Sequence, residues 1–109
     1  LLPVMLDHVN KGKLKIEKLI KLVCENPCDL FGIKNKGYIK ENFDADLTVI
    51  DMNKEVVIKD DWIESKCGWT PFNNYKVKGF PVATIVNGEI VMENNKILSP
   101  AKGKPLNFN

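Results

Sequence analysis

The sequence predicts a chain of the α+β class, with helices first and strands after them. Apolar residues recur at helical spacing through residues 1–31, and runs rich in β-branched residues come only after residue 46. The pair Asn87-Gly88 separates two such runs. Elements that are segregated along the chain are typical of α+β architectures rather than of alternating α/β ones. At 109 residues and 44% hydrophobic, the chain is expected to form at most one small domain.

The first predicted helix lies at the start of the chain. Its apolar residues recur at i, i+3, i+4 and i+7 and form one stripe: Leu2, Met5, Leu6 and Val9. Pro3 is compatible with a helix only in the first turn, and Gly12 predicts the end of this one.

Two further helices are predicted before any strand. The second has an inward stripe made of Ile16, Leu19, Ile20 and Val23. Asn26 followed by Pro27 predicts a helix boundary, because asparagine is a favoured N-cap and proline is favoured in the first turn. The third helix is therefore short, and Gly32 predicts its end.

After residue 33 the pattern changes from helical to extended. We expect a short extended piece at residues 36–39, then two strands at residues 47–50 and 55–58 with a turn at residues 52–54. Residues 59–66 are expected to hold one or two helical turns around Trp62. Glycine, proline and asparagine interrupt residues 67–78, which predicts an ordered loop. Pro100, Gly103 and Pro105 predict an extended arm after Ser99.

The strongest local prediction is a long β-hairpin centred on Asn87-Gly88. This pair readily adopts the positive φ angles of a type I′ turn, and a two-residue turn fixes the register of the strands. The expected pairs are Val86 with Glu89, Ile85 with Ile90, Thr84 with Val91, and Ala83 with Met92. One face would then carry Ala83, Ile85, Ile90 and Met92, and another layer has to cover it.

The charge pattern argues against nucleic-acid and membrane partners. All sixteen basic residues are lysines, they are spread along the chain, and the formal net charge is +2. Nucleic-acid recognition relies on arginine forks and clustered basic patches, which this chain lacks. No apolar run approaches the roughly eighteen residues of a membrane span, and no signal-peptide pattern is present. We therefore expect a cytoplasmic protein.

The candidate metal ligands and catalytic residues are few. Cys24, Cys28 and Cys67 are an odd number without C-x-x-C spacing, so buried free thiols are favoured over a disulfide framework or a metal site. Cys24 and Cys28 could still share one helical face if the helix continued past Asn26. His8 is the single histidine, lies off the apolar stripe and is predicted to be a surface residue, since metal sites and triads need convergent partners.

Two other groups of side chains allow a functional and a structural interpretation. Asp44 and Asp46 could form a carboxylate pair, but a turn in which Asp44 binds nearby backbone amides is favoured. Trp62, Trp69 and Phe72 could line a ligand pocket, but we favour a plug that covers the open face of the sheet.

Several motifs resemble a known superfamily. The motifs that begin at Glu25 (ENP), Leu30 (LFG), Lys36 (KGYI) and Asp44 (DADL) are similar to the C-terminal signature of metal-dependent amidohydrolases. The stretch from Ser65 (SKCGWTPF), followed by the stretch from Gly79 (GFPVATIVNG), resembles bacterial dihydroorotases more specifically. Residues 2–6 resemble the start of the last barrel helix of those enzymes.

The resemblance implies an activity and a fold. The activity is that of a zinc hydrolase of pyrimidine biosynthesis that interconverts N-carbamoyl-L-aspartate and dihydroorotate. The fold is a (β/α)8 barrel with a small composite β-sandwich. On this expectation, residues 1–33 are terminal helices of the barrel domain, and residues 34–109 form the C-terminal part of the sandwich subdomain with an extended tail.

The resemblance places no site residue on this chain. The family's metal ligands, which are a His-x-His pair, a carboxylated lysine and two further histidines, and its catalytic aspartate would belong to barrel strands upstream of Leu1. We therefore expect a C-terminal fragment without catalytic, cofactor-binding or metal residues, inactive alone and binding no zinc. Its expected partner is the missing N-terminal portion of the same enzyme, and a homodimer is a further option.

Two alternatives remain open from the sequence. The chain could belong to a sister cyclic amidohydrolase, such as an allantoinase or a hydantoinase. It could also be a self-contained, non-catalytic binding module that shares this sequence pattern.

Overall fold

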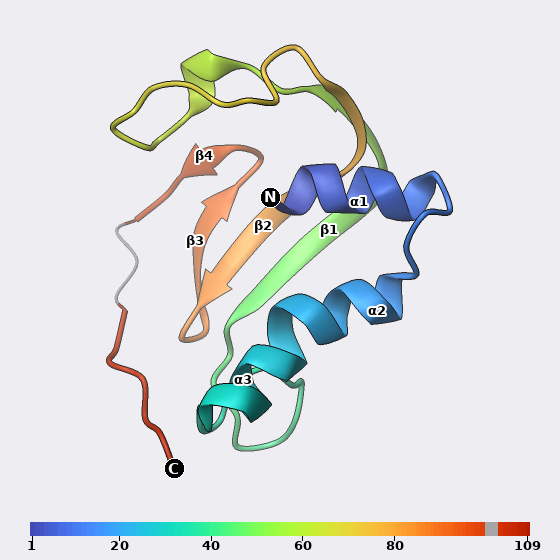
Figure 1. The fold of residues 1–109 in the computed structure, drawn as a ribbon. Coiled ribbons are helices and arrows are strands. Elements are labelled where there is room, and N and C mark those ends of the chain that lie inside the picture. Colours follow the sequence, from blue (N-terminus) through green and yellow to red (C-terminus); the bar gives the residue numbers. More distant parts are fainter. Residues whose placement is uncertain (100–102) are drawn as a thin grey trace.

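The computed structural model describes residues 1–99 and 103–109. Residues 100–102, which include Pro100 of the predicted arm, lie outside the described residues. Helices come first and one antiparallel sheet follows, which confirms the α+β class (Figure 1). The helices are α1 (Leu2–Asn10), α2 (Ile16–Ile20) and α3 (Asn26–Phe31). The strands are β1 (Leu47–Val57), β2 (Lys76–Val86), β3 (Glu89–Glu93) and β4 (Lys96–Ile97), in the spatial order β1-β2-β3-β4.

Helix α1 lies directly against β2. As predicted, Pro3 is in its first turn and the helix ends before Gly12, which has a φ of 70°. Leu6 is completely buried. The contact is so close that a Cβ atom built on Gly79 of β2 would lie 2.8 Å from the Cβ of Leu6. A glycine at this position is therefore what allows the helix to reach the strand.

Helices α2 and α3 form one continuous helical run, joined by a π-helical turn at Lys21–Glu25. Asn26 has helical angles, with φ −57° and ψ −41°, so the predicted N-cap at Asn26 is wrong. The Asn26 N–H donates to the carbonyl oxygen of Lys21, five residues earlier. Because Pro27 has no N–H to continue the normal ladder, a wider turn before it keeps the chain helical. Gly32 ends the run in the left-handed region, as predicted.

The predicted inward stripe of the second helix is only partly buried. Leu19 is 2% exposed, but Ile20 is 44% and Val23 is 43% exposed. The apolar side of this helix thus faces outward over most of its length.

Strand β1 is a single strand rather than two strands joined by a turn. Residues 47–51 and 55–57 both pair with β2 and run in the same direction, so the predicted turn at residues 52–54 is wrong. These three residues instead interrupt the ladder between Asp51 and Glu55. The Asp51 carboxylate accepts a hydrogen bond from the Asn53 N–H at 2.8 Å, which stabilises this irregularity.

Strand β2 begins at Lys76, so the predicted loop at residues 67–78 ends too late. Pro81 lies in the interior of this central strand, where proline is normally excluded because it cannot donate to the ladder. The register shifts there, and Val82 is the extra residue between the pairs Ile50–Pro81 and Val49–Ala83. The carbonyl oxygen of Val82 accepts from the Asn94 N–H at 2.9 Å.

The β2–β3 hairpin confirms the predicted turn. Asn87 and Gly88 have φ angles of 50° and 81°, and the two pairs next to the turn are as predicted. Beyond them Val91 is an extra residue. The observed pairs are Thr84 with Met92 and Ala83 with Glu93, so the pairs predicted from an unbroken ladder are wrong. The bulge buries Val91 and leaves Ile90 49% exposed, which also revises the predicted apolar face.

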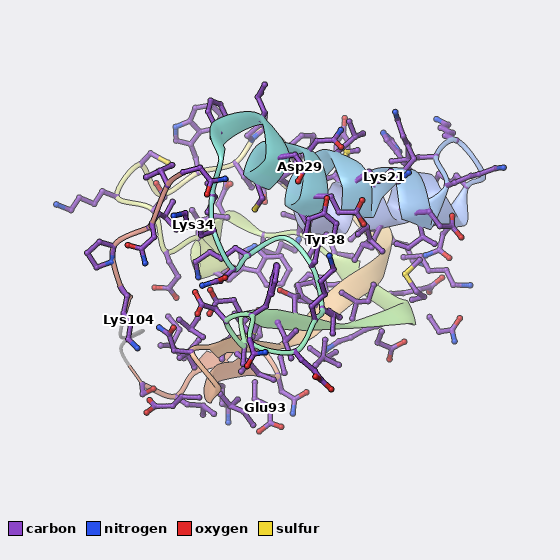
Figure 2. The ribbon with its side chains drawn as sticks, turned by 90° about the horizontal axis from the view of Figure 1, so that it is seen from below. Lys21, Asp29, Lys34, Tyr38, Glu93 and Lys104 are labelled. Atoms are coloured by element: carbon purple, nitrogen blue, oxygen red, sulfur yellow. The ribbon has the colours of Figure 1, made fainter. Side chains whose placement is uncertain are left out.

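The remaining segments are irregular. A single 3₁₀ turn at Asp60–Trp62 agrees with the predicted helical turn. Residues 36–39 form no regular strand, and Gly37 bends the chain with a φ of 85°. Figure 2 shows the side chain of Tyr38, from this segment, close to that of Asp29 on α3; its hydroxyl donates to the Asp29 carboxylate at 2.7 Å.

The described end of the chain returns to the helices. Phe108 pairs with Ile33 in an isolated antiparallel bridge. The Lys34 N–H donates to the carbonyl oxygen of Asn107, and the Asn109 N–H donates to that of Gly32, both at 2.8 Å. The end of the predicted arm therefore docks beside the end of α3.

The buried core is small for a chain of this length. Its apolar members in the described part of the chain are Leu6, Leu19, Ile58, Val77, Phe80 and Val91. The radius of gyration is 15.0 Å, whereas a compact domain of this length has about 13 Å. None of the described helices has the length and hydropathy that crossing a bilayer requires.

Candidate functional site

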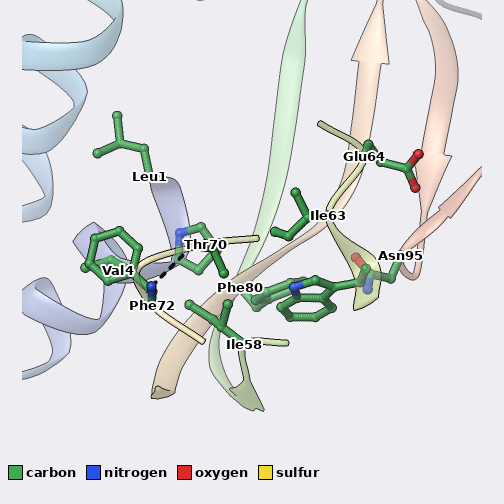
Figure 3. A pocket seen from close by; sticks show the side chains of 11 residues that line it. Leu1, Val4, Ile58, Ile63, Glu64, Thr70, Phe72, Phe80 and Asn95 are labelled. Carbon is green, nitrogen blue, oxygen red and sulfur yellow. Dashed lines mark hydrogen bonds between the residues drawn. The ribbon is translucent and has the colours of Figure 1, made fainter. Parts of the chain in front are cut away.

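A groove of about 240 Å³ lies between α1 and the loop that follows β1 (Figure 3). Ile58 and Phe80 form its floor on the sheet side, and Thr70 and Glu64 add polar groups. Its other lining residues are Leu1, Pro3, Val4, Trp62, Ile63, Phe72 and Asn95. Among the described residues, the lining contains no histidine, cysteine or lysine. The lining of the groove is therefore mainly apolar and suits an apolar group.

The predicted aromatic plug is confirmed in part. Trp62 stacks on Phe80 of β2, with ring centroids 5.5 Å apart, and so covers the sheet. Phe72 lines the groove and meets Tyr75 edge to face at 5.7 Å. Trp69, however, is 61% exposed and does not belong to the plug. Of the three aromatic residues predicted to form the plug, only Trp62 and Phe72 therefore belong to it.

His8 is not the simple surface residue that was predicted. It is half-buried, and its Nδ1 atom is buried without a hydrogen-bond partner among the described residues. The next residue toward the N-terminus, Asp7, is only 7% exposed. The buried side of α1 is therefore wider than its stripe of apolar residues. For this reason the position of His8 relative to the stripe wrongly predicted a surface residue.

All three cysteines are free, but they are less buried than predicted. Cys24 and Cys67 are exposed and Cys28 is half-buried. The helical run does bring Cys24 and Cys28 together around Gly37, where an added Cβ would lie 2.8 Å from the Cys28 Sγ. Partial burial, followed by the proximity of Cys28, raises the pKa of Cys24. A hydrogen bond with the Ser65 hydroxyl lowers the pKa of Cys67.

Asp44 and Asp46 converge on one cation rather than on a reacting group. The Lys36 Nζ lies 3.0 Å from the Asp44 carboxylate and also forms an ion pair with Asp46. The second oxygen of Asp46 accepts from the Asn87 N–H at 2.8 Å, which fixes the hairpin turn. It is therefore Asp46, and not Asp44, that binds a backbone amide. The hydrogen bond from Lys36 lowers the pKa of Asp46.

No group of three or more histidine, cysteine, aspartate or glutamate side chains within residues 1–99 and 103–109 could hold a metal ion. A catalytic zinc site needs three protein ligands and an open position. The donors in the described part of the chain do not fit such a site.

A polar contact between α1 and the sheet was not predicted. The Asp7 carboxylate accepts from the Lys78 N–H at 3.1 Å and forms an ion pair with Lys11 at 2.5 Å. The Asn10 amide donates to the carbonyl oxygens of Lys78, at 2.6 Å, and of Met52, at 2.9 Å. We call Asp7, Asn10 and the backbone of Met52 and Lys78 the polar latch. The sequence gives little indication of this contact, because Asp7 and Asn10 bind backbone groups of residues that are distant in the chain.

This helical run, the four-stranded sheet and the hairpin are shared with proteins of known family. The chain belongs to the amidohydrolase family, whose family model, described as "Amidohydrolase family", matches residues 2–91.

Its relatives include dihydroorotases and a hydantoinase. The chain is 44% identical to a dihydroorotase of Pyrococcus horikoshii over 93% of its length, and 41% identical to one of Pyrococcus furiosus over 94%. It is 38% identical to an L-hydantoinase of Paenarthrobacter aurescens over 89% of its length. In each case it spans about a quarter or less of the relative, namely 24%, 24% and 22%.

Solved structures agree with this family. The L-hydantoinase of Arthrobacter aurescens matches with a TM-score of 0.86 and 37% identity over 90% of this chain and 22% of that one. A D-hydantoinase matches with a TM-score of 0.85 and 26% identity over 94% of this chain and 23% of that one.

Proposed function

We propose that this chain is the C-terminal part of a dihydroorotase, a hydrolase that interconverts dihydroorotate and N-carbamoyl-L-aspartate in pyrimidine biosynthesis. The observation that carries the proposal is the identity of 44% to the Pyrococcus horikoshii dihydroorotase, against 38% to the L-hydantoinase. The SKCGWTPF loop and the Asn87-Gly88 turn, which resemble dihydroorotases, lie within residues 2–91, which the amidohydrolase family model matches.

The contribution of this chain to such an enzyme is structural. Residues 1–33 would be terminal helices of a (β/α)8 barrel, and residues 34–109 would supply strands of a composite β-sandwich. The exposed apolar residues of the helical run support this assignment, because a barrel strand or helix packed on them would bury them. The partner is then the N-terminal portion of the same enzyme.

The zinc of such an enzyme would have to be held elsewhere. The single histidine has a buried Nδ1, and the described donors form no group that could hold a metal. This chain alone should therefore bind no zinc after dialysis, as measured by elemental analysis. Stoichiometric retained zinc would contradict this prediction and would point to Cys24 and Cys28.

The proposal is tested by assaying the intact enzyme that carries this chain. We expect hydrolysis of dihydroorotate and no comparable turnover of hydantoin or allantoin. Activity on hydantoin without activity on dihydroorotate would exclude a dihydroorotase.

A hydantoinase is the second candidate. It is favoured by the L-hydantoinase structure, with its TM-score of 0.86. The same assay separates the two candidates, since each substrate is offered to the same preparation.

A further inference from the structure

The groove between α1 and the loop after β1 has an apolar floor that the sheet holds in place. Phe80 is 6% exposed and Ile58 is 7% exposed, so both belong to the core. Trp62 stacks on Phe80 with their ring planes inclined by 24°, and Phe72 adds a further ring to the lining. A ligand would therefore meet an apolar surface that is already formed and would not have to order it.

The loop wall of the groove is also formed in advance, through hydrogen bonds within the loop. The Asp60 carboxylate accepts from the Thr70 N–H at 2.7 Å, and the Asp60 N–H donates to the Asn73 side-chain oxygen at 3.1 Å. The Thr70 hydroxyl accepts from the Phe72 N–H at 3.2 Å, which fixes the chain at the Phe72 ring (Figure 3).

The charge of the groove is negative and lies on one side of it. Glu64 is the only charged side chain among the described lining residues, and it forms no ion pair with a described residue. Figure 3 shows Glu64 and Asn95 on one side of the groove and the apolar side chains of Leu1 and Val4 on the other. The lining thus suits a ligand with an apolar body and one polar end.

The aromatic rings and the carboxylate favour the same charge on that polar end. The face of an aromatic ring attracts cations, most strongly in tryptophan. The Trp62–Phe80 stack already interacts with one ammonium group, since the Lys54 Nζ lies 5.5 Å from the centre of the Phe80 ring. A cation in the groove would gain from the Trp62 ring and from Glu64, whereas an anion would be repelled by both.

We propose that this groove is a binding site for a small organic ammonium ion, with one ring or a short branched chain as its apolar body. The body would lie on Ile58, Phe72 and Phe80. The ammonium group would lie beside Trp62 and Glu64. This inference does not rest on the proposed function, because no residue of the groove is assigned a part in the hydrolysis of a cyclic amide.

The probes are benzylammonium and benzyl alcohol, which have nearly the same size and differ in charge at pH 7. The intact enzyme that carries this chain is titrated with each probe at one ionic strength, and binding is measured by calorimetry. We expect benzylammonium to bind about fivefold more tightly or better, because the ring faces and the carboxylate both favour the charged probe.

Glu64→Gln is the decisive variant, because it keeps the size of the side chain and removes its charge. It should weaken the binding of benzylammonium about threefold or more and leave that of benzyl alcohol unchanged. Asp61→Asn is the matched control, since it neutralises an exposed carboxylate of the same loop that does not line the groove. This control should bind both probes as the wild type does.

Three results would overturn the proposal. The first is the absence of benzylammonium binding at about 10 mM, which would mean that the groove is closed in the intact enzyme. The second is equal affinity for the two probes. The third is a Glu64→Gln variant that binds benzylammonium like the wild type or like Asp61→Asn, which would place the bound probe elsewhere. The assay with dihydroorotate is a separate measurement, so each proposal can fail without the other.

Discussion

Gly79 shows how a single residue sets the distance between helix and sheet. Its φ is 104°, and an added Cβ would lie 2.8 Å from Leu6. Gly79→Ala should therefore lower the free energy of unfolding of the intact enzyme by about 2–4 kcal/mol, from backbone strain and overpacking together.

The control for this substitution is Gly12→Ala. Gly12 also has a positive φ, of 70°, but nothing lies within 4 Å of an added Cβ. Its cost should be limited to backbone strain, about 1 kcal/mol. Equal losses in chemical denaturation would mean that α1 can move away from Gly79 freely.

Tyr38 gives a second prediction for a single residue. Its hydrogen bond to Asp29 raises its pKa to about 12. The neutral phenol is thus favoured in the folded state, so its contribution to stability is present below the ordinary pKa near 10 and is lost as the pH rises toward 12. Asp29→Asn should move the tyrosinate absorbance midpoint of Tyr38 back toward 10.

Tyr38→Phe identifies which part of the absorbance change belongs to Tyr38, since the chain also contains Tyr75. If the Tyr38 midpoint is the same with and without the Asp29 carboxylate, that carboxylate does not control the phenol.

Single residues were predictable where their effect is local. Gly12, Gly32 and the Asn87-Gly88 pair end helices or turn the chain by their own backbone freedom, so the sequence identified them correctly. Asp7 and Asn10 were not identified, because their partners lie 71, 68 and 42 residues away and are backbone groups that carry no sequence signature.

The hairpin is the element whose stability depends most directly on one position. Gly88 has a φ of 81° and open space around it. Gly88→Val should cost more than about 1 kcal/mol in the intact protein, because a β-branched residue is strained in this region. Gly103→Val is the control, since Gly103 also has open space but no positive φ. An unchanged unfolding midpoint in Gly88→Val would show that the turn rearranges without cost.

The sequence predicted the types of the helices and strands correctly but not all of their boundaries. Residues 52–54 look like a turn because polar residues interrupt two apolar runs, yet pairing with the 11-residue strand β2 keeps both runs in one strand. Asn26-Pro27 looks like a helix start, yet a π-helical turn absorbs the missing N–H. Val91 shifts the hairpin register through a bulge. In each case the local sequence is compatible with two backbone conformations, and strand pairing or packing determines which of them forms.

At the scale of the whole molecule, too much apolar surface is exposed for an independent domain. Ile20, Leu22 and Val23 on the helical run and Leu47, Val49 and Val57 on β1 are all 37–47% exposed. We expect residues 1–109, expressed alone, to self-associate or to unfold without a cooperative transition. Size-exclusion chromatography and thermal unfolding measure both properties. A stable, cooperatively folded monomer would contradict this and would favour the self-contained binding module.

The overall architecture was partly accessible from the sequence. The segregation of helices and strands gave the α+β class, and the motifs gave the family. The way α1 crosses the sheet was not accessible, because it depends on Gly79, the broken ladder of β1 and the polar latch acting together.

The broken ladder of β1 also bears on aggregation. This strand lies at one edge of the sheet, where a free backbone edge can recruit a second chain. Steric zippers need about six or seven consecutive residues of high β-propensity and low charge. In β1 the stretch Leu47–Asp51, whose pairing with β2 already shifts between Val49 and Ile50, ends at the second irregularity, and Lys54 and Glu55 follow it. The interruption that receives Asn10 thus divides the pairing of this edge strand into two short stretches with charged residues between them, a pattern that disfavours steric-zipper pairing.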